Sequence, residues 1–290
     1  MRTLVYRHLK LFLKNPVNII LSFLSSIVIL SLYFLFIRDF TIKAVSDYGF
    51  ISNYNDLFVD RLMTSGLLIV IGATSVLSII FIFVKDNYSG IIKDFIVTPV
   101  SYIKIIYSYF IASFIVSTII TLIVYIGIEL FFILNFQYYT SLETIIFSIL
   151  IIFSSNIVAS LLILIIAFCI NNFTSFATFQ TLYGVVIGFF TGVYIPIGYY
   201  PKIIRNIFFY FPLCQTTSLL RNIGTNVITK DILNNYPVNI HHILYETFGV
   251  NLTLNDKVIT INGQIIMVIT SIVLLNLILI FIIYLKRYKR

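Results

Sequence analysis

The chain has 290 residues, of which 60% are hydrophobic and only 10% are charged, and its formal net charge is +8. Soluble globular domains are usually about 45–50% apolar and about 25% charged. The mean hydropathy is +1.04, and the charges gather in blocks between long uncharged runs. Together these features exclude an ordinary soluble domain and predict an integral membrane protein.

The first segment, residues 1–16, predicts a cytoplasmic interfacial helix. At about 100° per residue, Arg7, Lys10 and Lys14 share one sector of this helix, and aliphatic and aromatic side chains cover most of the rest. Such a helix is expected to lie in the plane of the lipid headgroups, with its basic stripe facing water and anionic lipid. The alternative is an ordinary basic flank of the first span, without a separate helix.

Six stretches have the length of about 20 apolar residues that a membrane-spanning helix needs. They are Val17–Ile37, Leu62–Val84, Ile105–Leu134, Thr144–Ile170, Phe176–Ile197 and Gln264–Leu285. The predicted fold class is an all-α integral membrane protein with six transmembrane helices. Spans one to five occupy 17–198, with a cytoplasmic loop at 85–104, and 264–290 holds the sixth span and a basic tail.

The distribution of lysine and arginine predicts the orientation of the chain, because cytoplasmic loops carry the excess of these residues. An even number of spans leaves both ends on one side. Eleven of the 19 basic residues fall on that side, namely Arg2, Arg7, Lys10, Lys14, Lys85, Lys93, Lys104, Lys286, Arg287, Lys289 and Arg290. Both termini are therefore predicted to be cytoplasmic, and the abundance of Ile, Asn, Phe and Tyr suggests a bacterial source.

The loop between the second and third spans contains a second short amphipathic helix. After Gly90, the apolar residues Ile91, Ile92, Phe95 and Ile96 fall on one helical face, and Pro99 ends the helix. An amphipathic helix in a cytoplasmic loop suits a groove on another protein. The alternative, that it rests on the membrane surface, is equally compatible with the residues alone.

The apolar spans contain small and polar residues, each of which has a functional interpretation and a purely structural one. Gly184, Gly188 and Gly192 form a stripe that allows close helix approach, either to another subunit or within one chain. Polar groups inside a membrane are costly and often functional. Glu129, Asn156 and Gln180 are therefore candidates to line a pathway. The alternative for Asn156 and Gln180 is that their amides bond to backbone carbonyls of neighbouring helices, and we favour this alternative. The alternative for Glu129 is that its side chain reaches the outer membrane surface.

The region 199–263 is the largest polar part of the chain and is predicted to hold a re-entrant segment and a small extracytoplasmic cap. The apolar stretch from Ile203 to Leu213 is too short to span a membrane and is interrupted by Pro212, as in re-entrant or interfacial segments.

Several chemistries are excluded by what the sequence lacks. No glycine is followed by lysine, so the chain has no nucleotide-binding P-loop and is not expected to be an enzyme by itself. His241 and His242 are adjacent rather than four residues apart, so no metal site is predicted. No catalytic residue or nucleic-acid partner is indicated.

The order of these features resembles the type-2 family of ATP-binding cassette (ABC) exporter permeases, over nearly the whole chain. The resemblance is carried by the layout of the spans and by the loop from Asp86 to Gly90 and on through Thr98 to Ser101. It is carried also by the segment from Gly192 through Pro196, Pro201 and Pro212 to Arg221, which is similar to the family's re-entrant pieces broken by prolines.

The resemblance implies a permease dimer, formed with itself or with a sister chain, that binds two copies of a separate ABC ATPase subunit carrying ATP and Mg. The helix from Gly90 to Pro99 would be the coupling helix, and the first and fifth spans would line the dimer axis. The long outer segment favours export of a drug, an antimicrobial peptide or another amphipathic substrate. The alternatives are an ion-driven secondary transporter, which usually shows internal repeats, and a membrane-embedded transferase, which needs convergent acid/base groups.

Overall fold

The computed structural model describes residues 1–47, 55–170, 172–233, 244–254 and 257–288. In this part of the chain, six helical segments are long and apolar enough to cross a membrane: Ser22–Ser46, Asp56–Tyr88, Tyr102–Phe136, Leu142–Cys169, Phe173–Phe190 and Ile261–Lys286. Within the same residues, strand structure is confined to the short antiparallel pair of β1 (Thr253–Leu254) and β2 (Lys257–Val258). The protein is an all-α integral membrane protein, as the sequence predicts.

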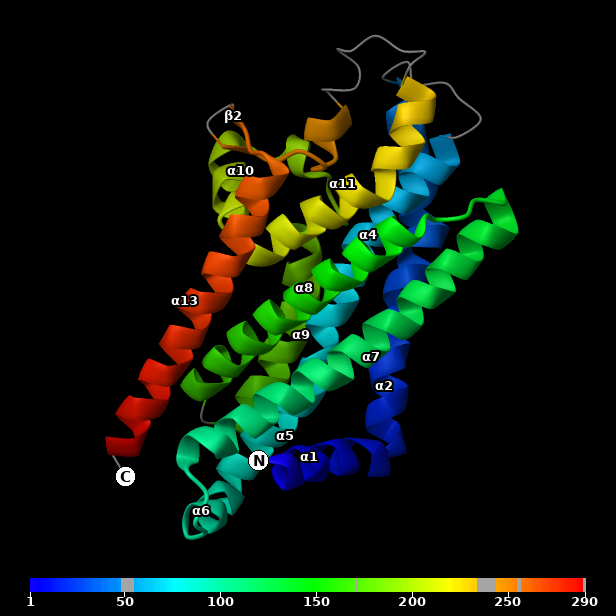
Figure 1. The fold of residues 1–290 in the computed structure, drawn as a ribbon. Helices are drawn as coiled ribbons and strands as arrows, with labels where there is room; N and C mark the ends of the chain where they lie inside the picture. Colours follow the sequence, from blue (N-terminus) through cyan, green and yellow to red (C-terminus); the bar gives the residue numbers. More distant parts are fainter. Residues whose placement is uncertain (48–54, 171, 234–243, 255–256, 289–290) are drawn as a thin grey trace.

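The first span is assembled from three helical pieces. After α1 (Arg2–Lys14), Pro16 is the first residue of α2 (Pro16–Leu32), where a missing N–H breaks no helical bond. The helix then widens into a π-helical turn, η1 (Tyr33–Ile37), and continues as α3 (Arg38–Asp47). Such π-turns are rare and are frequently found at functional sites. Figure 1 shows α1 lying across the end of the bundle, at a steep angle to α2.

The second span is the centre of the bundle. It consists of α4 (Asn55–Ser75) and α5 (Leu77–Tyr88), and 83% of its most apolar stretch is buried, against 12% for the first span and 11% for the last. Between α4 and α5 the Thr74 and Ser75 hydroxyls bond to carbonyls one turn back, a pattern that bends helices. The short helix α6 (Ile91–Ile96) follows.

Four further long helices complete the set of spans. The pair α7 (Tyr102–Phe136) and α8 (Leu142–Cys169) is joined by a short link, in which Gln137 takes the left-handed conformation and Ser141 caps α8. The helix α9 (Phe173–Phe190) begins at Asn172, whose side chain caps it. The last span is α13 (Ile261–Tyr288). Figure 1 shows that α1, α6 and the end of α13 lie at one end of the bundle, as an even number of spans requires.

The segment between the fifth and sixth spans lies at the opposite end (Figure 1). It contains a 3₁₀ turn, η2 (Ile197–Tyr199), then α10 (Lys202–Phe209) and α11 (Pro212–Leu233), which packs on α4, α8 and α13. Pro196 and Pro201 precede η2 and α10. Parts of the predicted cap, 234–243 and 255–256, lie outside the described residues.

Three span boundaries differ from those predicted by more than five residues. The first span continues through Arg38 to Ser46 rather than ending at Ile37. The second span begins at Asp56 rather than Leu62 and so includes Arg61, because partners on other helices neutralise its charged residues. The fifth helix ends at Phe190 rather than Ile197. There Gly192 adopts a φ of +65°, and the N–H of Val193 bonds to the carbonyl of Gly188, which closes the helix before Pro196.

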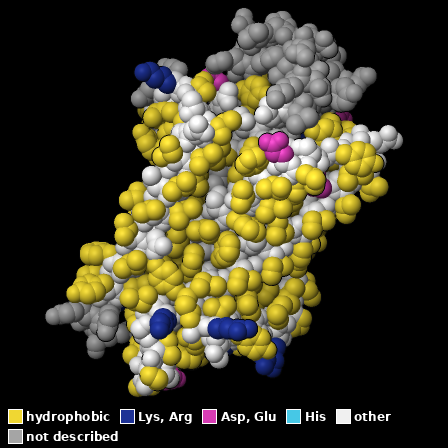
Figure 2. Space-filling view, in the orientation of Figure 1, with side chains coloured by type: hydrophobic (Ala, Val, Ile, Leu, Met, Phe, Trp, Pro, Cys, Tyr) yellow, Lys and Arg dark blue, Asp and Glu magenta, His cyan; other side chains and the backbone are white. Residues whose placement is uncertain are grey.

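The surface has the pattern of a membrane protein. On the face shown in Figure 2, hydrophobic side chains cover most of the length between the two ends. At the end that carries α1 and α6, the Lys and Arg side chains visible on this face lie near α1 (Figure 1 and Figure 2). Large apolar residues such as Leu35, Phe36 and Leu134 are 70–80% exposed, which suits contact with lipid rather than with water.

Candidate functional site

The end of the bundle that carries α1 and α6 is held together by a polar network. The Arg7 Nη1 donates to Asp86 Oδ2 at 2.8 Å, and the Tyr109 hydroxyl donates to the same oxygen at 2.6 Å. The side chain of Asp86 is 5% exposed, so its charge is compensated by Arg7 rather than by water. This network fastens α1 to α5 and α7. Arg7 therefore differs from Lys10 and Lys14, which are exposed as the basic stripe predicts.

His8, next to Arg7, is fully buried and stacks on Tyr109 with ring centroids 3.8 Å apart. The Ser108 hydroxyl donates to the Ile105 carbonyl, so it can only accept from His8 Nε2, 2.9 Å away. His8 Nδ1 then accepts from Arg7 at 3.2 Å. Burial, with the nearby charge of Arg7, lowers the pKa of His8 to about 4, so the neutral ring is the one that fits.

The predicted coupling helix is α6, and its apolar residues divide between two directions. Gly90 starts it with a φ of +81°, a conformation that favours glycine. Ile92 is buried, and Phe95 lies under the Arg7 guanidinium at 5.0 Å. Ile96 is 41% exposed.

The remaining residues of the predicted loop lie at its edges. Ile91 is half-buried, and Pro99 lies in the exposed turn after α6. In that turn Val97 is 87% exposed. Ser101 precedes α7 without a side-chain capping bond. The loop thus presents Ile96 and Val97 outward and anchors itself through Ile92 and Phe95.

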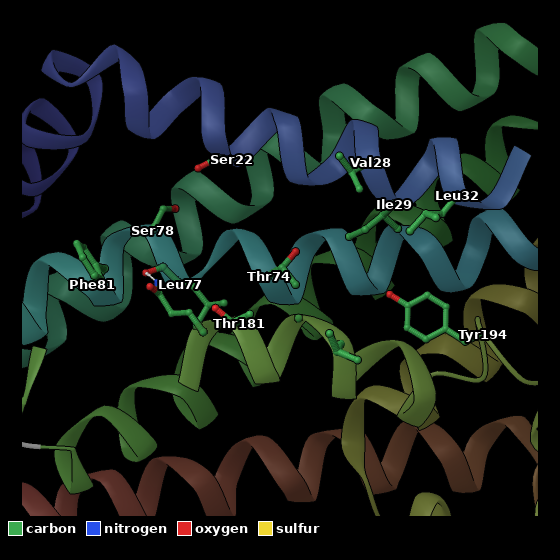
Figure 3. A pocket seen from close by; sticks show the side chains of 13 residues that line it. Ser22, Val28, Ile29, Leu32, Thr74, Leu77, Ser78, Phe81, Thr181 and Tyr194 are labelled. Carbon is green, nitrogen blue, oxygen red and sulfur yellow. Dashed lines mark hydrogen bonds between the residues drawn. The ribbon is translucent and has the colours of Figure 1, made fainter. Parts of the chain in front are cut away.

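An open groove of about 690 Å³ lies in the bundle between α2, the junction of α4 with α5, and α9. Figure 3 shows Ile29 and Leu32 of α2 on one side of it, facing Thr74 and Leu77 of the second span. Phe81 lies toward one end and Tyr194 toward the other. Most of the lining is apolar, with a few hydroxyls and one amide among it. The groove can therefore accept an apolar molecule that has few polar groups.

The predicted polar candidates occupy three different places. The Gln180 amide donates to the Leu77 carbonyl at 3.3 Å and also lines the groove. Asn156 is buried, donates to Thr118 Oγ1 at 3.3 Å and fills the space beside Gly72, away from the groove. Glu129 forms an ion pair. Only Gln180 among the three reaches the groove.

Glu129 pairs with Arg61, which sequence reasoning treated as the boundary of a span. The Arg61 guanidinium bonds to both carboxylate oxygens of Glu129, at 2.6 and 2.8 Å, and lies 4.0 Å from the Phe132 ring. Thr140 bonds to both partners. Such a pair neutralises two charges that would be costly inside a membrane.

A second charged cluster, not foreseen from the sequence, holds the outer part of the first span. Arg38 follows the π-turn and bonds to both oxygens of Asp60 and to Asp56 at 2.9 Å. The Tyr33 hydroxyl donates to Asp60 at 2.6 Å. The spacing of Asp56 and Asp60, one helical turn apart, was the available signal. The outer part of the first span is thus fastened by polar contacts, as is α1 before it, with the groove between them.

The glycine stripe does not act as one surface in this chain. Gly184 lines the groove, with no atom within 4 Å of an added Cβ. Gly188 packs against the Tyr194 ring, where an added Cβ would lie 2.2 Å from a ring carbon. Gly192 lies beyond the helix, in the turn that ends it. Gly188 and Gly192 therefore serve packing within the chain.

Arg221, at the end of the proline-containing segment, is fully buried and bonds to backbone carbonyls from three separate segments. Its guanidinium donates to Leu62, Phe248 and Gly192 at 3.2, 2.9 and 3.0 Å. Burial lowers its pKa to about 10, so it remains charged at neutral pH. The segments before it are divided at Pro196, Pro201 and Pro212, each at the start of a helical piece. Arg221 joins these pieces to the second span.

Metal chemistry finds no support in the residues that the structure describes. No group of three or more His, Cys, Asp or Glu side chains close enough to hold a metal ion occurs among them. His241 and His242 lie outside the described residues.

Comparison with known proteins gives one match. The family model described as "ABC-2 family transporter protein" matches residues 39–284, well over half of the chain. No curated protein and no solved structure matches the chain.

Proposed function

This chain belongs to the ABC-2 family of transporter proteins, and we propose that it is the permease subunit of an ATP-driven exporter. As a member of this family it is a multi-pass membrane subunit of an ABC transporter. The proposal adds the direction of transport, which is out of the cell, and a substrate that is a drug, an antimicrobial peptide or another amphipathic molecule.

The energy source in this proposal is a separate ABC ATPase subunit, in two copies, which carries ATP and Mg. The observation that carries this assignment is the division of α6 into an anchored and an exposed side. Ile96 and Val97 are 41% and 87% exposed beside the buried Ile92. Exposed aliphatic residues on a short helix beyond the membrane belt are suited to a groove on a partner protein.

The contacts of α6 also supply a route for force. Phe95 touches Arg7 of α1, and Arg7 is paired with Asp86 at the end of the second span. A displacement of α6 by the ATPases would therefore move α1 and the central helix together. Rigid-body movement of packed helices is a common form of switching. We expect it to change the width of the groove between the first, second and fifth spans.

The working unit proposed is a pair of permeases, formed by two copies of this chain or by this chain and a sister chain. The exposed apolar side chains of α2 and α9, such as Ile27, Leu182 and Val185, offer a surface for that pairing. The proposed orientation has both termini in the cytoplasm, and the excess of lysine and arginine on their side supports it. The location proposed is the cell membrane of a bacterium.

The proposal is tested by a substitution in the exposed part of the coupling loop. Val97→Asp introduces a charge where the side chain is 87% exposed, so it should leave the permease folded. We expect it to abolish co-purification of the ATPase and ATP-dependent export, while Val97→Thr, of similar shape, retains both. Normal export by Val97→Asp, or an ATPase that never co-purifies with the unaltered chain in mild detergent, would overturn the proposal.

A further inference from the structure

A second cavity lies where α1 meets the end of the second span. Its volume is about 540 Å³, and its lining combines cations with apolar side chains. Arg7 and Lys14 of α1 and Lys85 of α5 supply the positive charge, and Asp86 is the one acid among its lining residues. It lies at the end of the bundle that carries α1 (Figure 1).

The cations of this cavity are not fully compensated by the protein. Asp86 is paired with Arg7 and also accepts from Tyr109. Among the described residues, neither Lys14 nor Lys85 forms an ion pair. The lining therefore has two positive charges beyond the Arg7–Asp86 pair. Two ammonium groups in one lining, beside apolar walls, favour the binding of an anion.

This basic cavity adjoins the apolar groove of the bundle. Phe81 lines both of them, at the end of the groove away from Tyr194 (Figure 3). On α2 the groove runs from Ser22 to Leu32, which corresponds to about 15 Å at the rise of an α-helix. One molecule could therefore place a charged group in the basic cavity and an alkyl chain in the groove.

We propose that the basic cavity and the groove form one binding site for an anionic amphiphile. Its head, a phosphate, sulfate or carboxylate group, lies between Lys14 and Lys85. Its apolar tail passes Phe81 and extends along α2 toward Tyr194. The same chemistry is offered by a phospholipid of the surrounding leaflet and by a transported substrate. The substrate reading rests on the proposed function, whereas binding itself does not.

The test uses the whole chain in nanodiscs of phosphatidylcholine without any ATPase. A small fraction of phosphatidylglycerol with a photoreactive group in its acyl chain is added, and a phosphatidylcholine probe with identical chains serves as the comparison. Labelled peptides are located by mass spectrometry. We expect the phosphatidylglycerol probe to label the groove segments of α2, α5 and α9 saturably and in preference to the phosphatidylcholine probe.

Matched variants separate this site from a general attraction of lipid to a basic surface. Lys14→Gln and Lys85→Gln should each reduce labelling about five-fold, because a cation near an anionic headgroup contributes about 1 kcal/mol. Lys10→Gln removes an exposed cation of the same helix outside the cavity, and should leave labelling unchanged.

A second pair of variants tests the groove. Gly184→Leu fills open space in the groove and should block labelling there, while Gly127→Leu, on α7 and equally open around its Cβ, should not. Equal labelling by both probes, or equal loss in the Lys10 variant and the cavity variants, would overturn the proposal.

A final arm identifies the source of the amphiphile. With the ATPase and ATP added in vesicles, a substrate leaves the site and accumulates in the opposite leaflet or outside. A resident phospholipid stays bound and continues to be labelled. Both results require the binding site. The first identifies its occupant as a transported substrate, and the second identifies it as a resident phospholipid. Specific labelling without any ATP-dependent export would contradict the proposed function but support the site.

Discussion

Breaking the Arg61–Glu129 pair offers the most direct test of how this bundle tolerates charge. The two side chains are 6% and 14% exposed and are joined by two bonds of 2.6 and 2.8 Å. Glu129→Gln leaves a buried guanidinium without its counter-charge, which is expected to lower the free energy of unfolding by about 3–5 kcal/mol. At about 2–4 °C per kcal/mol for a large domain, the melting temperature should fall by about 10 °C.

The double variant Arg61→Met/Glu129→Met removes both charges and keeps apolar volume at both positions. Replacing a buried ion pair by apolar groups is often close to neutral, so the double variant should be more stable than Glu129→Gln alone. The coupling free energy, measured against Arg61→Met and Glu129→Met made singly, is expected to be about 3 kcal/mol. Part of the remaining loss should come from the contact of Arg61 with Phe132, about 1 kcal/mol for a cation over an aromatic ring.

The chain contains its own probe for this measurement. It has no tryptophan and two cysteines, of which Cys214 is buried and Cys169 exposed. Burial raises the pKa of Cys214 to about 12, so its thiol reacts with a fluorogenic maleimide only after unfolding. With Cys169→Ser as background, the dye reports melting.

A matched control decides the outcome. Glu143→Gln, at an exposed position in the first turn of α8, should leave melting unchanged. The ion pair does not stabilise the bundle as described if Glu129→Gln melts within error of Glu143→Gln. The same conclusion follows if the destabilisation of the double variant equals or exceeds the sum for Arg61→Met and Glu129→Met.

Three further predictions concern α1, the glycines and the coupling loop. The pKa of His8 is about 4 in the folded chain and about 6.5 when α1 is released, so released α1 binds the proton first and docking weakens as the pH falls between these values. By pH 5 the free energy of docking α1 should fall by about 2 kcal/mol, so the amides of α1 should exchange their hydrogens faster. In the His8→Phe variant this added pH dependence of exchange should be absent. Gly188→Ala should lower the melting temperature because its Cβ would meet the Tyr194 ring. Gly184→Ala, which has open space around its Cβ, should raise the melting temperature slightly. Equal shifts in the two variants would contradict the packing described. Gly90→Val should impair ATPase binding more than Gly90→Asn, because asparagine tolerates the φ of +81° far better than valine. The assay is pull-down of the ATPase by each variant. Equal retention of the ATPase by both variants would show that the conformation of residue 90 is unimportant.

The number and approximate placement of the spans could be predicted from the sequence, because hydrocarbon imposes a minimum length on any apolar helix. The second span shows where that reasoning stops. Its first turns contain Asp56, Asp60 and Arg61, which hydropathy reads as outside the membrane. Their partners, Arg38 and Glu129, lie on other helices and are many residues away in sequence. Compensation between distant charges is a tertiary property that no local pattern records.

The candidate site was predictable to a similar degree. Periodicity found α6, and it found the sector of α1 that carries Lys10 and Lys14. It could not find that Arg7 turns toward Asp86, because a single helix does not reveal which of its polar residues meets a buried acid on another helix. The groove also escaped prediction. Cavities arise where side chains from several helices fail to meet, and the sequence of one helix does not contain that information.

The loose attachment of the first span bears on how this transporter can acquire new specificities. The span is fastened in its outer part by Arg38, and α1, which precedes it, is fastened by Arg7. Only 12% of the most apolar stretch of the span is buried. The groove wall that it supplies, including Val28 and Leu32, therefore lies largely outside the packed core. Substitutions there change the shape offered to a guest molecule without leaving a void in the core. Selection can thus alter what is carried while the contacts of Arg7 and Arg38 keep the helix in place.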